Sequence, residues 1–326
     1  LDNTKKKARQ DEWQEQTQSV FASVEVGWKS MLYLTLTGRN DWASQLANSS
    51  TPCFFYPSVG LSGVISEMLT LPEFIDYMKV RGSFSSVGMP YPRNLTSPTY
   101  EYDEANQQWK PKTHYPIKDL KPERTNSWEL GLDMRLFKDF SLGFSWYLAN
   151  TFNQTFDPKV SVSSGYSKIY LQTGYVRNSG VELSLGYGHT WNNHLHWESN
   201  FTLSHNKNTI KDLVTSYIHP ETGLPITQNR LDVGGLGKAR FILKKGGTLG
   251  DLYTQSDLKR DNSGMVEIDP SGALTTEDNL PDIKLGSVFP KANLAWNNRF
   301  EWRGISLSAL FTARIGGIAY SATQAA

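Results

Sequence analysis

The sequence lacks most of the features that stabilise or anchor small proteins. It has one cysteine, Cys53, in 326 residues, so no disulfide can form within the chain. No apolar run approaches the roughly 20 residues that a membrane-spanning helix requires. Lys and Arg number 33 against 32 Asp and Glu, with no basic block and no acidic tail. These shortages exclude a disulfide scaffold, a helical membrane protein and a basic nucleic-acid binder.

The first residues also lack the signals of a secretory leader. Residues 1–18 are polar and charged without an apolar core, and the chain starts at Leu1 rather than at a methionine. We expect either a mature form or, in preference, a piece cut from a longer polypeptide.

Aromatic residues, in contrast, are abundant. Ten Trp, fifteen Tyr and fifteen Phe make up 12% of the chain, although only 38% of it is hydrophobic. This combination is unusual for an enzyme with a deep core. It is typical of an outer-membrane barrel, in which one face of each strand is apolar and aromatic girdles mark the two membrane interfaces.

Alternation with a period of two runs through the chain, and helical periodicity is scarce. In residues 128–136 one face carries Trp, Leu, Leu, Met and Leu, while the other carries Glu129, Gly131, Asp133 and Arg135. Alternate side chains of a strand point to opposite faces, so this strand has an apolar and a polar face. The pattern predicts about ten strands in five pairs, approximately at 20–26 with 32–37, 55–61 with 80–84, 128–136 with 140–148, 181–187 with 195–203, and 294–300 with 305–311.

The predicted connections fall into two classes. Within pairs they are mostly two to four residues, with a short helical segment at 68–77. Between pairs they are long, at 41–52, 88–124, 153–175 and 209–284. Short turns at one end and long loops at the other are typical of outer-membrane barrels, whereas a soluble sandwich has loops at both ends. The sequence therefore predicts an all-β, antiparallel transmembrane barrel.

Five motifs in order resemble one family. Residues 120–133 contain LKPE and SWELGLD, which resemble the "LKPE…SWE.GLD" segment of the SusC/RagA branch of TonB-dependent outer-membrane transporters. Four weaker matches accompany it: YPSV at 56–59, MKVRGSF at 78–84, VRNSGVEL at 176–183 and RIGG at 314–317. In the first of these, Leu61-Ser62-Gly63 stands where the family usually has Gly-Trp.

The resemblance implies a plugged barrel of 22 strands in the outer membrane of a Gram-negative, Bacteroidetes-type bacterium. It implies TonB-driven import of oligosaccharides or peptides, with a SusD-like surface lipoprotein and the TonB complex as partners. We expect residues 1–326 to be part of that barrel wall, without the plug domain, the TonB-contacting segment or the last strands.

Two sets of residues are candidates for function. Aromatic side chains in or beside the long connections could stack on sugar rings or fill pockets, although packing between loops would also use them. These aromatic candidates are Trp42, Tyr100, Tyr102, Trp109, Tyr115, Tyr166, Tyr170 and Tyr253. Polar residues expected to face the lumen are Glu129, Asp133, Arg135, Glu182 and Glu198.

The remaining motifs indicate no catalysis, cofactor or metal. Residues 261–269 resemble a calcium loop of related transporters, but the central ligand is missing and the spacing is one residue short, so we favour an ordinary loop. His189, His194 and His196 lack a completing Cys or carboxylate other than Glu198, which favours polar residues near a turn. The glycines at 234–237 lack the GK[ST] of a phosphate loop, and those at 60–63 do not form a nucleophile elbow.

Three functions are compatible with these patterns. The first is the barrel wall of an active importer with no enzymatic activity. The second is a secreted β-sandwich that binds glycans, with its apolar faces buried between two sheets. The third is a passive porin. The cargo, glycan or peptide, stays open because specificity resides in loops that are distant in sequence.

Overall fold

The fold is that of a computed structural model of the whole chain, and the structure describes part of its residues. The ranges described are 12, 14–47, 49–92, 95, 101–103, 107–110, 114–115, 120–156, 168–191, 194–218 and 223–321.

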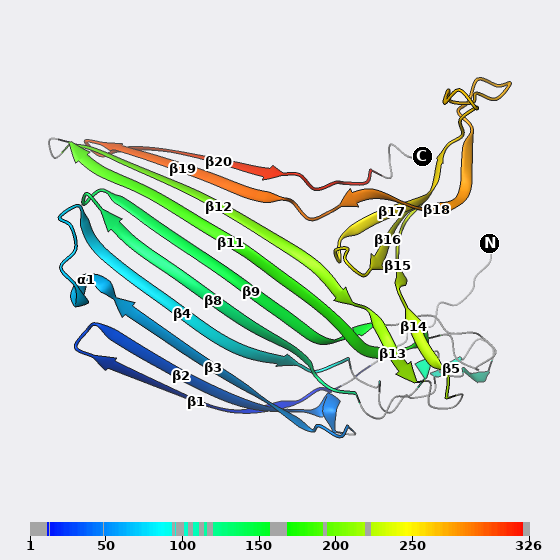
Figure 1. Cartoon of the computed structure of the whole chain (residues 1–326), viewed down its shortest axis with the longest axis horizontal. Helices are drawn as coiled ribbons and strands as arrows, with labels where there is room; N and C mark the ends of the chain where they lie inside the picture. Colours follow the sequence, from blue (N-terminus) through cyan, green and yellow to red (C-terminus); the bar gives the residue numbers. More distant parts are fainter. Residues whose placement is uncertain are drawn as a thin grey trace, which may run out of the picture.

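One antiparallel sheet dominates the described part of the chain (Figure 1). It has ten strands in the order β1-β2-β3-β4-β8-β9-β11-β12-β19-β20, so each strand pairs with the next strand of the sheet along the chain. The bounds are β1 (Thr17–Trp28), β2 (Leu32–Ala43), β3 (Cys53–Val64), β4 (Ile75–Met89), β8 (Glu123–Leu136), β9 (Phe140–Phe156), β11 (Leu171–Trp191), β12 (Leu195–Asp212), β19 (Ala292–Trp302) and β20 (Ile305–Ile315).

The connections are arranged as the sequence predicted. The tight turns lie at one end of the sheet and the long connections at the other (Figure 1). Lys29 and Ser30, Phe137 and Lys138, and Arg303 and Gly304 adopt positive φ in three of these turns, which lets two strands join over few residues. The connection between β3 and β4, at the same end, holds α1 (Ile65–Met68); the helical segment was expected at 68–77, but the helix ends at Met68 and β4 already starts at Ile75. The predicted fold class is confirmed.

Strand pairing gives the sheet two different faces. Residues directly opposite each other in an antiparallel pair share a face. Following the register from Arg81 through Gly131, Ser145, Glu182 and Ser204 defines the polar face. Following it from Val80 through Leu132, Phe144, Leu183, Leu203 and Leu294 defines the apolar face.

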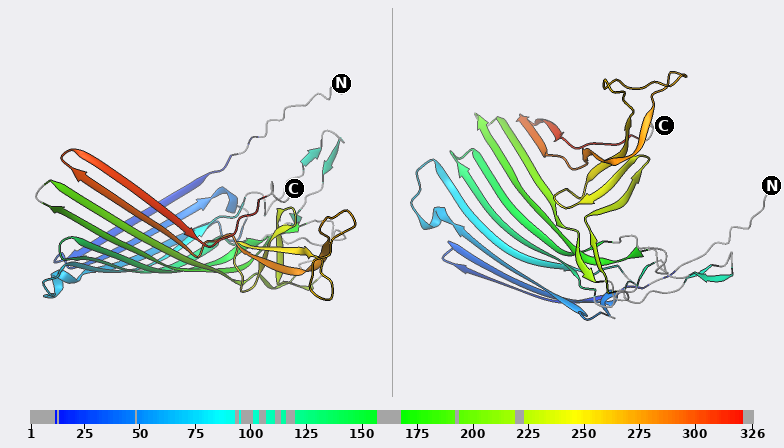
Figure 2. Two further views of the ribbon diagram at one scale, coloured as in Figure 1. Left: turned by 90° about the horizontal axis from the view of Figure 1, so that it is seen from above. Right: turned by 45° about the vertical axis from the view of Figure 1, so that its right-hand side comes forward.

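The sheet is curved and open. In Figure 2 its two edges, at β1 and β20, rise on the same side of the middle strands, and they do not pair with each other. A single hollow of about 690 Å³ contacts polar-face residues from β4, β8, β11 and β20. Six strand spacings of about 4.8 Å separate β4 from β20, so one hollow reaches both only if the polar face is concave. The sheet is a segment of a barrel wall with its polar side inward.

The region between β12 and β19 corrects the sequence prediction. Residues 209–284 were expected to be a long loop, but β12 continues to Asp212 and the region has its own secondary structure. A four-stranded sheet, here called the loop sheet, has the strands β15 (Arg230–Leu236), β16 (Ala239–Lys244), β17 (Asp251–Leu258) and β18 (Thr276–Ser287). A hairpin of β13 (Val214–Ile218) and β14 (Pro225–Gln228) precedes it.

The other long connections are shorter than predicted. Strand β2 runs on to Ala43 and is followed by the short helix η1 (Ser44–Leu46), while β9 ends at Phe156 and β11 starts at Leu171. Small elements within them are β5 (Glu101–Asp103), β6 (Gln108–Lys110), β7 (His114–Tyr115) and β10 (Lys168–Ile169). The alternation that predicts the middle of a strand does not mark the residue at which the strand ends.

Two buried clusters hold the loop end against the sheet. One contains Ala43, Leu46, Phe54, Tyr91, Leu95 and Leu120. The other joins Val176 and Ile210, on the polar face of β11 and β12, to Leu213, Leu231 and Leu243. Since Val176 and Ile210 are fully buried, the loop sheet is packed onto the inward side of the wall rather than extended freely into solvent.

Helices contribute little to this fold. In the ranges given above, no helix has the length and apolar character needed to cross a membrane.

Candidate functional site

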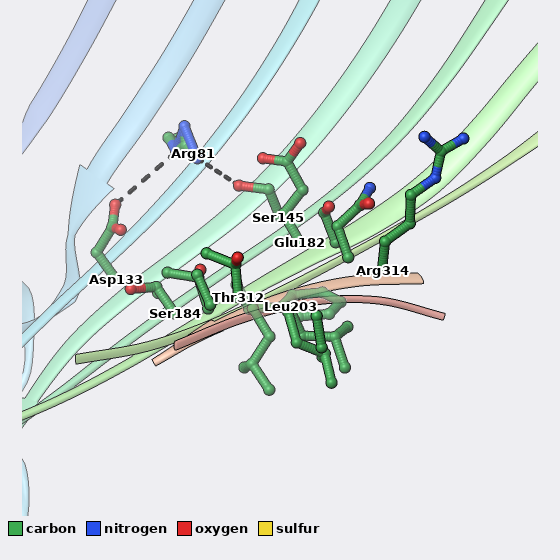
Figure 3. Close-up of a pocket in the computed structure, with 17 residues that line it drawn as sticks. Arg81, Asp133, Ser145, Glu182, Ser184, Leu203, Thr312 and Arg314 are labelled. Carbon is green, nitrogen blue, oxygen red and sulfur yellow. Dashed lines mark hydrogen bonds and ion pairs between the residues drawn. The ribbon is translucent and has the colours of Figure 1, made fainter. Parts of the chain in front are cut away.

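Arg81 links three neighbouring strands on the polar face through ion pairs and a hydrogen bond (Figure 3). From β4, Arg81 donates through Nη1 to Glu129 Oε1 of β8 at 3.1 Å and through Nη2 to Ser145 Oγ of β9 at 2.6 Å. Its Nε lies 3.8 Å from Asp133 Oδ2. The guanidinium therefore crosses the strands at mid-length and ties two carboxylates together.

A glycine makes room for this arrangement. Gly131 pairs directly with Arg81 across the β4–β8 ladder, and a Cβ there would lie 2.7 Å from Arg81 Cζ. Only a residue without a side chain lets the guanidinium lie flat over its neighbour strand. The predicted strand thus has a glycine at the position where Arg81 leaves no space for a side chain.

The hollow beside this cluster is lined by both polar and apolar residues. Its polar-face residues include Arg81, Asp133, Ser145, Glu182, Ser184, Thr202, Thr312 and Arg314. Arg314 donates to the Val288 carbonyl at 2.5 Å, and no ion pair joins Glu182 to any residue that the structure describes. The Glu182 carboxylate therefore lies in the hollow without an ion-pair partner among the described residues, next to the groups that Arg81 binds.

The five polar residues predicted for the lumen lie on one face. The register places Glu129, Asp133, Arg135, Glu182 and Glu198 on the polar face. Only Glu129 and Asp133 belong to the Arg81 cluster. Arg135 is exposed, and Glu198 accepts a hydrogen bond from Asn200 Nδ2 at 2.8 Å.

Sequence reasoning missed Arg81 and Ser145. Both occupy the polar positions of alternating strands, so the face was predictable. Their contact was not, since 64 residues separate them and only the strand register brings them together.

An exposed aromatic pair stands out among the predicted loop aromatics. Tyr102 and Trp109 are cross-strand partners in the β5–β6 hairpin, with ring centroids 5.2 Å apart and an edge-to-face angle of 63°. Trp109 is 65% exposed and Tyr102 is 41% exposed. Two rings fixed at an angle and open to solvent form a surface on which a sugar ring or an apolar side chain can pack.

Two other predicted aromatics are placed differently. Trp42 continues the alternation of β2 and lies on the apolar face, opposite Gln18 and Cys53. The Tyr253 ring is 7% exposed within the loop sheet, and Lys244 Nζ lies 4.7 Å from its centroid. Trp42 therefore faces away from the hollow, and Tyr253 packs within the loop sheet.

The remaining four aromatic candidates form no comparable exposed pair among the described residues. Tyr170 packs against the buried cluster around Phe54 and Leu120. The backbone of Tyr115 forms β7, paired in parallel with β10. Tyr100 and Tyr166 lie outside the described residues.

The buried carboxylates of the loop sheet form ion pairs within the loop sheet. The Asp282 carboxylate is 6% exposed and accepts from Arg230 Nε at 2.6 Å and Nη2 at 2.9 Å, with Lys244 Nζ at 2.9 Å. The hydrogen bonds from Arg230 are the main reason that the pKa of Asp282 lies well below its usual range. Asp251, fully buried, binds Lys284 Nζ at 2.6 Å.

An aromatic belt crosses the apolar face near the turn end. Measured between ring centroids, Phe137 lies 6.4 Å from Phe140 and Phe140 lies 4.8 Å from Tyr187. The centroids of Tyr187 and Trp197 are 5.2 Å apart. Trp197 then stacks on Phe300 at 5.6 Å. Nearer the loop end, Phe84 and Trp128 pair at 4.7 Å. Leu136 pairs with Phe140, so it marks the height of the aromatic belt on β8. Trp128 lies about 26 Å from Leu136 along the strand. The apolar face between the two sets of rings therefore has the height of the apolar band of an outer-membrane barrel.

The candidate calcium loop is made of two similar turns. Asp261 Oδ1 accepts from the backbone N–H groups of Ser263 and Met265, and Asp269 Oδ1 accepts from those of Ser271 and Ala273. Both carboxylates are therefore engaged by their own turns.

The histidines also have local partners. His189 Nδ1 lies 2.7 Å from Asp139 Oδ2, and His196 Nδ1 lies 2.9 Å from Thr190 Oγ1. Over the described ranges, no three His, Cys, Asp or Glu side chains come together as metal ligands would.

Comparison with known proteins matches this architecture. The family model described as "TonB dependent receptor-like, beta-barrel" matches residues 2–263. Two similar proteins of Formosa agariphila, TonB-dependent receptors P39 and P26, are each 24% identical to the chain. The alignments cover 79% and 94% of this chain but 23% and 32% of those receptors, so the chain spans about a third of their length or less.

Solved structures show the same fold. The RagAB peptide transporter is similar with a TM-score of 0.72 at 20% identity, covering 91% of this chain and 33% of that one. Its importer form in the "open-open" state gives a TM-score of 0.69 at 19% identity, over 93% and 33%. At these identities, the likeness concerns the fold alone.

Proposed function

The chain belongs to the TonB-dependent receptor family, matching its β-barrel, and on this premise we propose that it forms part of the wall and mouth of an active importer in the outer membrane of a Gram-negative bacterium. Such a protein moves a solute without changing its covalent structure, so its residues bind and guide rather than catalyse. The chain spans about a third of the length of these relatives and similar structures, so a plug and a TonB-contacting region outside these 326 residues are part of the proposal.

One observation carries this proposal: the apolar face is exposed from one edge of the sheet to the other. Val24, Leu36, Leu61, Trp128, Phe144, Leu185, Trp296 and Leu307 on this face are all at least 39% exposed. A water-soluble monomer rarely exposes an apolar patch of more than a few hundred Å². A surface of alternate apolar residues between two sets of aromatic rings fits the hydrocarbon core of a membrane.

The inward surface supports a role in passage of a polar cargo. The polar face presents the Arg81 cluster, Glu182 and the other lumen-facing residues to the interior. At the loop end, the loop sheet and the Tyr102–Trp109 pair stand at the entrance. We assign the first contact with cargo to this aromatic pair, because its rings are exposed and already oriented.

The proposed cargo and partners are inferred from the family and not from a particular contact in the structure. One of the similar structures is named a peptide transporter, RagAB. We therefore propose oligosaccharides or peptides as cargo, a surface lipoprotein of the SusD type over the mouth and the TonB complex as the energy source.

The test is uptake by a bacterium from which the full gene has been deleted. Labelled oligosaccharides and peptides are supplied separately, and accumulation of one class is expected to fall and to return when the gene is restored. The same loss is expected in a strain without TonB. Uptake that persists without TonB supports a passive porin instead and overturns active import.

A second measurement separates the barrel from a secreted β-sandwich. The full gene product is expected to fractionate with outer membranes and to need detergent for solubility. A folded, monomeric protein in detergent-free buffer would contradict the membrane assignment.

A further inference from the structure

An apolar contact attaches the loop sheet to the inward side of the wall. Val176 of β11 and Ile210 of β12 pair with each other on the polar face, yet they are only 1% and 0% exposed. They are covered because they form one buried cluster with Leu231 of β15 and Leu243 of β16. Packed sheets lie about 10 Å apart, so the loop sheet moves the inner surface at β11 and β12 toward the barrel interior by about this distance.

Hydrogen bonds hold the connection between β16 and β17 against the end of β12. The Ile210 N–H donates to the Gly247 carbonyl, and the Gly246 N–H donates to the Ile210 carbonyl, both at 2.8 Å. The Leu249 N–H donates to Asn208 Oδ1, also at 2.8 Å. Asn208 is buried. The attachment at β12 therefore combines apolar burial with satisfied backbone groups.

A second attachment lies at β18. Beyond β20, the Ile318 N–H donates to the Ser287 carbonyl at 3.0 Å, and Arg314 of β20 donates to the Val288 carbonyl. Only residues 288–291 join β18 to β19. In the wall, β19 separates β12 from β20. The loop sheet is thus bound at two separate strands, which prevents it from turning about either one alone.

The glycines between β16 and β17 allow close packing and do not form a free hinge. A Cβ on Gly247 would lie 2.8 Å from Asp251 Oδ2, and one on Gly250 would lie 2.8 Å from Val288 Cγ2. The fully buried Asp251 also accepts from the Thr248 N–H at 3.1 Å and from Thr248 Oγ1 at 2.7 Å. Movement of the loop sheet at this connection would first have to break these contacts.

We propose that the loop sheet is a fixed constriction of the passage, which sets an upper limit to the size of the cargo. It stays bound to β12 and β20 while cargo moves through the part of the lumen that it leaves open. A gate would instead have to expose Val176 and Ile210 and release both attachments in every transport cycle. The inference rests on the proposed function, because a passage exists only in an importer.

Cross-linking tests whether the loop sheet stays in place. Lys245 Nζ of the β16–β17 connection lies 2.7 Å from Asp212 Oδ1 of β12, in an exposed ion pair whose loss costs little stability. Cysteines at these two positions, with Cys53→Ser, can be joined in the full gene product by a short bismaleimide that has a cleavable disulfide in its spacer. The cargo is a length series of labelled oligosaccharides or peptides, of the class whose uptake the gene restores.

Cross-linked D212C/K245C cells are expected to take up short cargo at the same rate as untreated cells of that variant. D212C and K245C alone, treated with the same reagent, are the matched controls. A loss of uptake that is specific to the double variant and returns when a reducing agent cleaves the spacer would overturn the proposal.

The length series then tests the size limit. Replacing residues 230–287, from the start of β15 to the end of β18, with a short Gly-Ser linker should allow uptake of cargo too long for the parent. The control replaces only residues 260–275, which project from β17 and β18 away from the ten-stranded sheet, and should keep the parental limit (Figure 1). The same limit in the parent and in the 230–287 replacement would overturn the proposal.

Uptake by the parent and outer-membrane fractionation of each variant keep the two proposals distinct. A parent without TonB-dependent uptake refutes active import, and the constriction with it. A parent that imports cargo only while its loop sheet is not cross-linked refutes the fixed constriction alone. If the 230–287 replacement does not reach the outer membrane, the cross-linking result decides.

Discussion

Arg81 and Gly131 face each other across the β4–β8 ladder, and the guanidinium of one occupies the space that a side chain on the other would need. A Cβ on Gly131 would lie 2.7 Å from Arg81 Cζ. The arginine can contact Glu129 and Ser145 only because its partner is glycine. The polar cluster therefore depends on a residue that has no polar group.

The first prediction is that Gly131→Val destabilises the full gene product. The new side chain must displace Arg81 from Glu129 and Ser145, and overpacking of this kind costs about 1–3 kcal/mol. The measurement is urea unfolding in detergent, followed by tryptophan fluorescence. Gly188→Val is the control, because nothing lies within 4 Å of a Cβ at Gly188.

The coupling between the two residues gives a sharper criterion. Once Arg81 is replaced by Ala, Gly131→Val should cost much less, since the space is then free. Equal costs in the two backgrounds would show that the glycine and the arginine act independently.

The second prediction concerns the direction in which the apolar face points. Leu132 lies in the middle of β8 on the apolar face, so Leu132→Arg is expected to cost about 2–4 kcal/mol near the membrane midplane. Arg135→Gln, on the exposed polar face, should change the free energy of unfolding by less than about 0.5 kcal/mol. Comparable losses for the two variants, measured by refolding into lipid vesicles, would mean that the assigned faces are wrong.

The sequence was sufficient to predict the strands and their faces, because alternation reports directly on a wall that is wet on one side. It also predicted the turns, since Lys138 and Gly304 interrupt two alternating runs. Trp42 was expected in a long connection because the predicted strand ended at residue 37, whereas β2 continues to Ala43. Continuing the same alternation from Leu36 past Gly38 and Asn40 would have placed Trp42 on the apolar face.

The loop sheet could not be predicted in the same way. Its buried residues Leu231, Ile242 and Leu243 do not alternate over a membrane length, and Ile242 and Leu243 are adjacent in sequence. The burial of Leu231 and Leu243 depends on the cluster that they form with Val176 and Ile210, and on pairing between short strands. Similarly, the Arg81 cluster requires a register between strands 48 and 64 residues apart, which no local pattern reveals.

The third prediction is that the Tyr102–Trp109 pair contributes to cargo capture. Replacing both residues with Ala should reduce uptake at low cargo concentration by roughly tenfold, because an aromatic contact contributes about 0.5–1.5 kcal/mol. Uptake at saturating cargo should change little, since the pair acts before transport. The assay is accumulation of labelled cargo over a range of concentrations.

Two controls accompany this measurement. Tyr253→Phe keeps the packed ring of the loop sheet and should leave uptake unchanged. Trp42→Phe keeps an aromatic ring on the apolar face and should do the same. If the Tyr102/Trp109 variant takes up cargo with parental concentration dependence, the pair is only a packing contact of its hairpin.

The fourth prediction is that the loop sheet loosens in acid through Asp282. Hydrogen bonds from Arg230, and then the hydrogen bond from Lys244, hold the pKa of this carboxyl below its usual range. Because the folded pKa is lower than the unfolded value of about 3.9, the stabilisation is complete above that value and is lost as the pH falls through it toward the folded pKa. Backbone amides of β15 and β18 in the full gene product should therefore be protected equally at pH 7 and pH 5, and less at pH 3.

Hydrogen–deuterium exchange, corrected for the intrinsic pH dependence of amide exchange, measures this effect. Asp282→Asn should reduce protection of the loop sheet at neutral pH by about 1–2 kcal/mol, less than the cost of breaking a fully buried pair, because Arg230 and Lys244 can reach water. It should also remove most of the acid dependence. Asp278→Asn, which breaks an exposed pair with Lys238, should leave both nearly unchanged. If Asp282→Asn retains the parental loss of protection below pH 4, other carboxylates such as Asp251 must be responsible for it, and Asp282 is not the acid-sensitive group of the mouth.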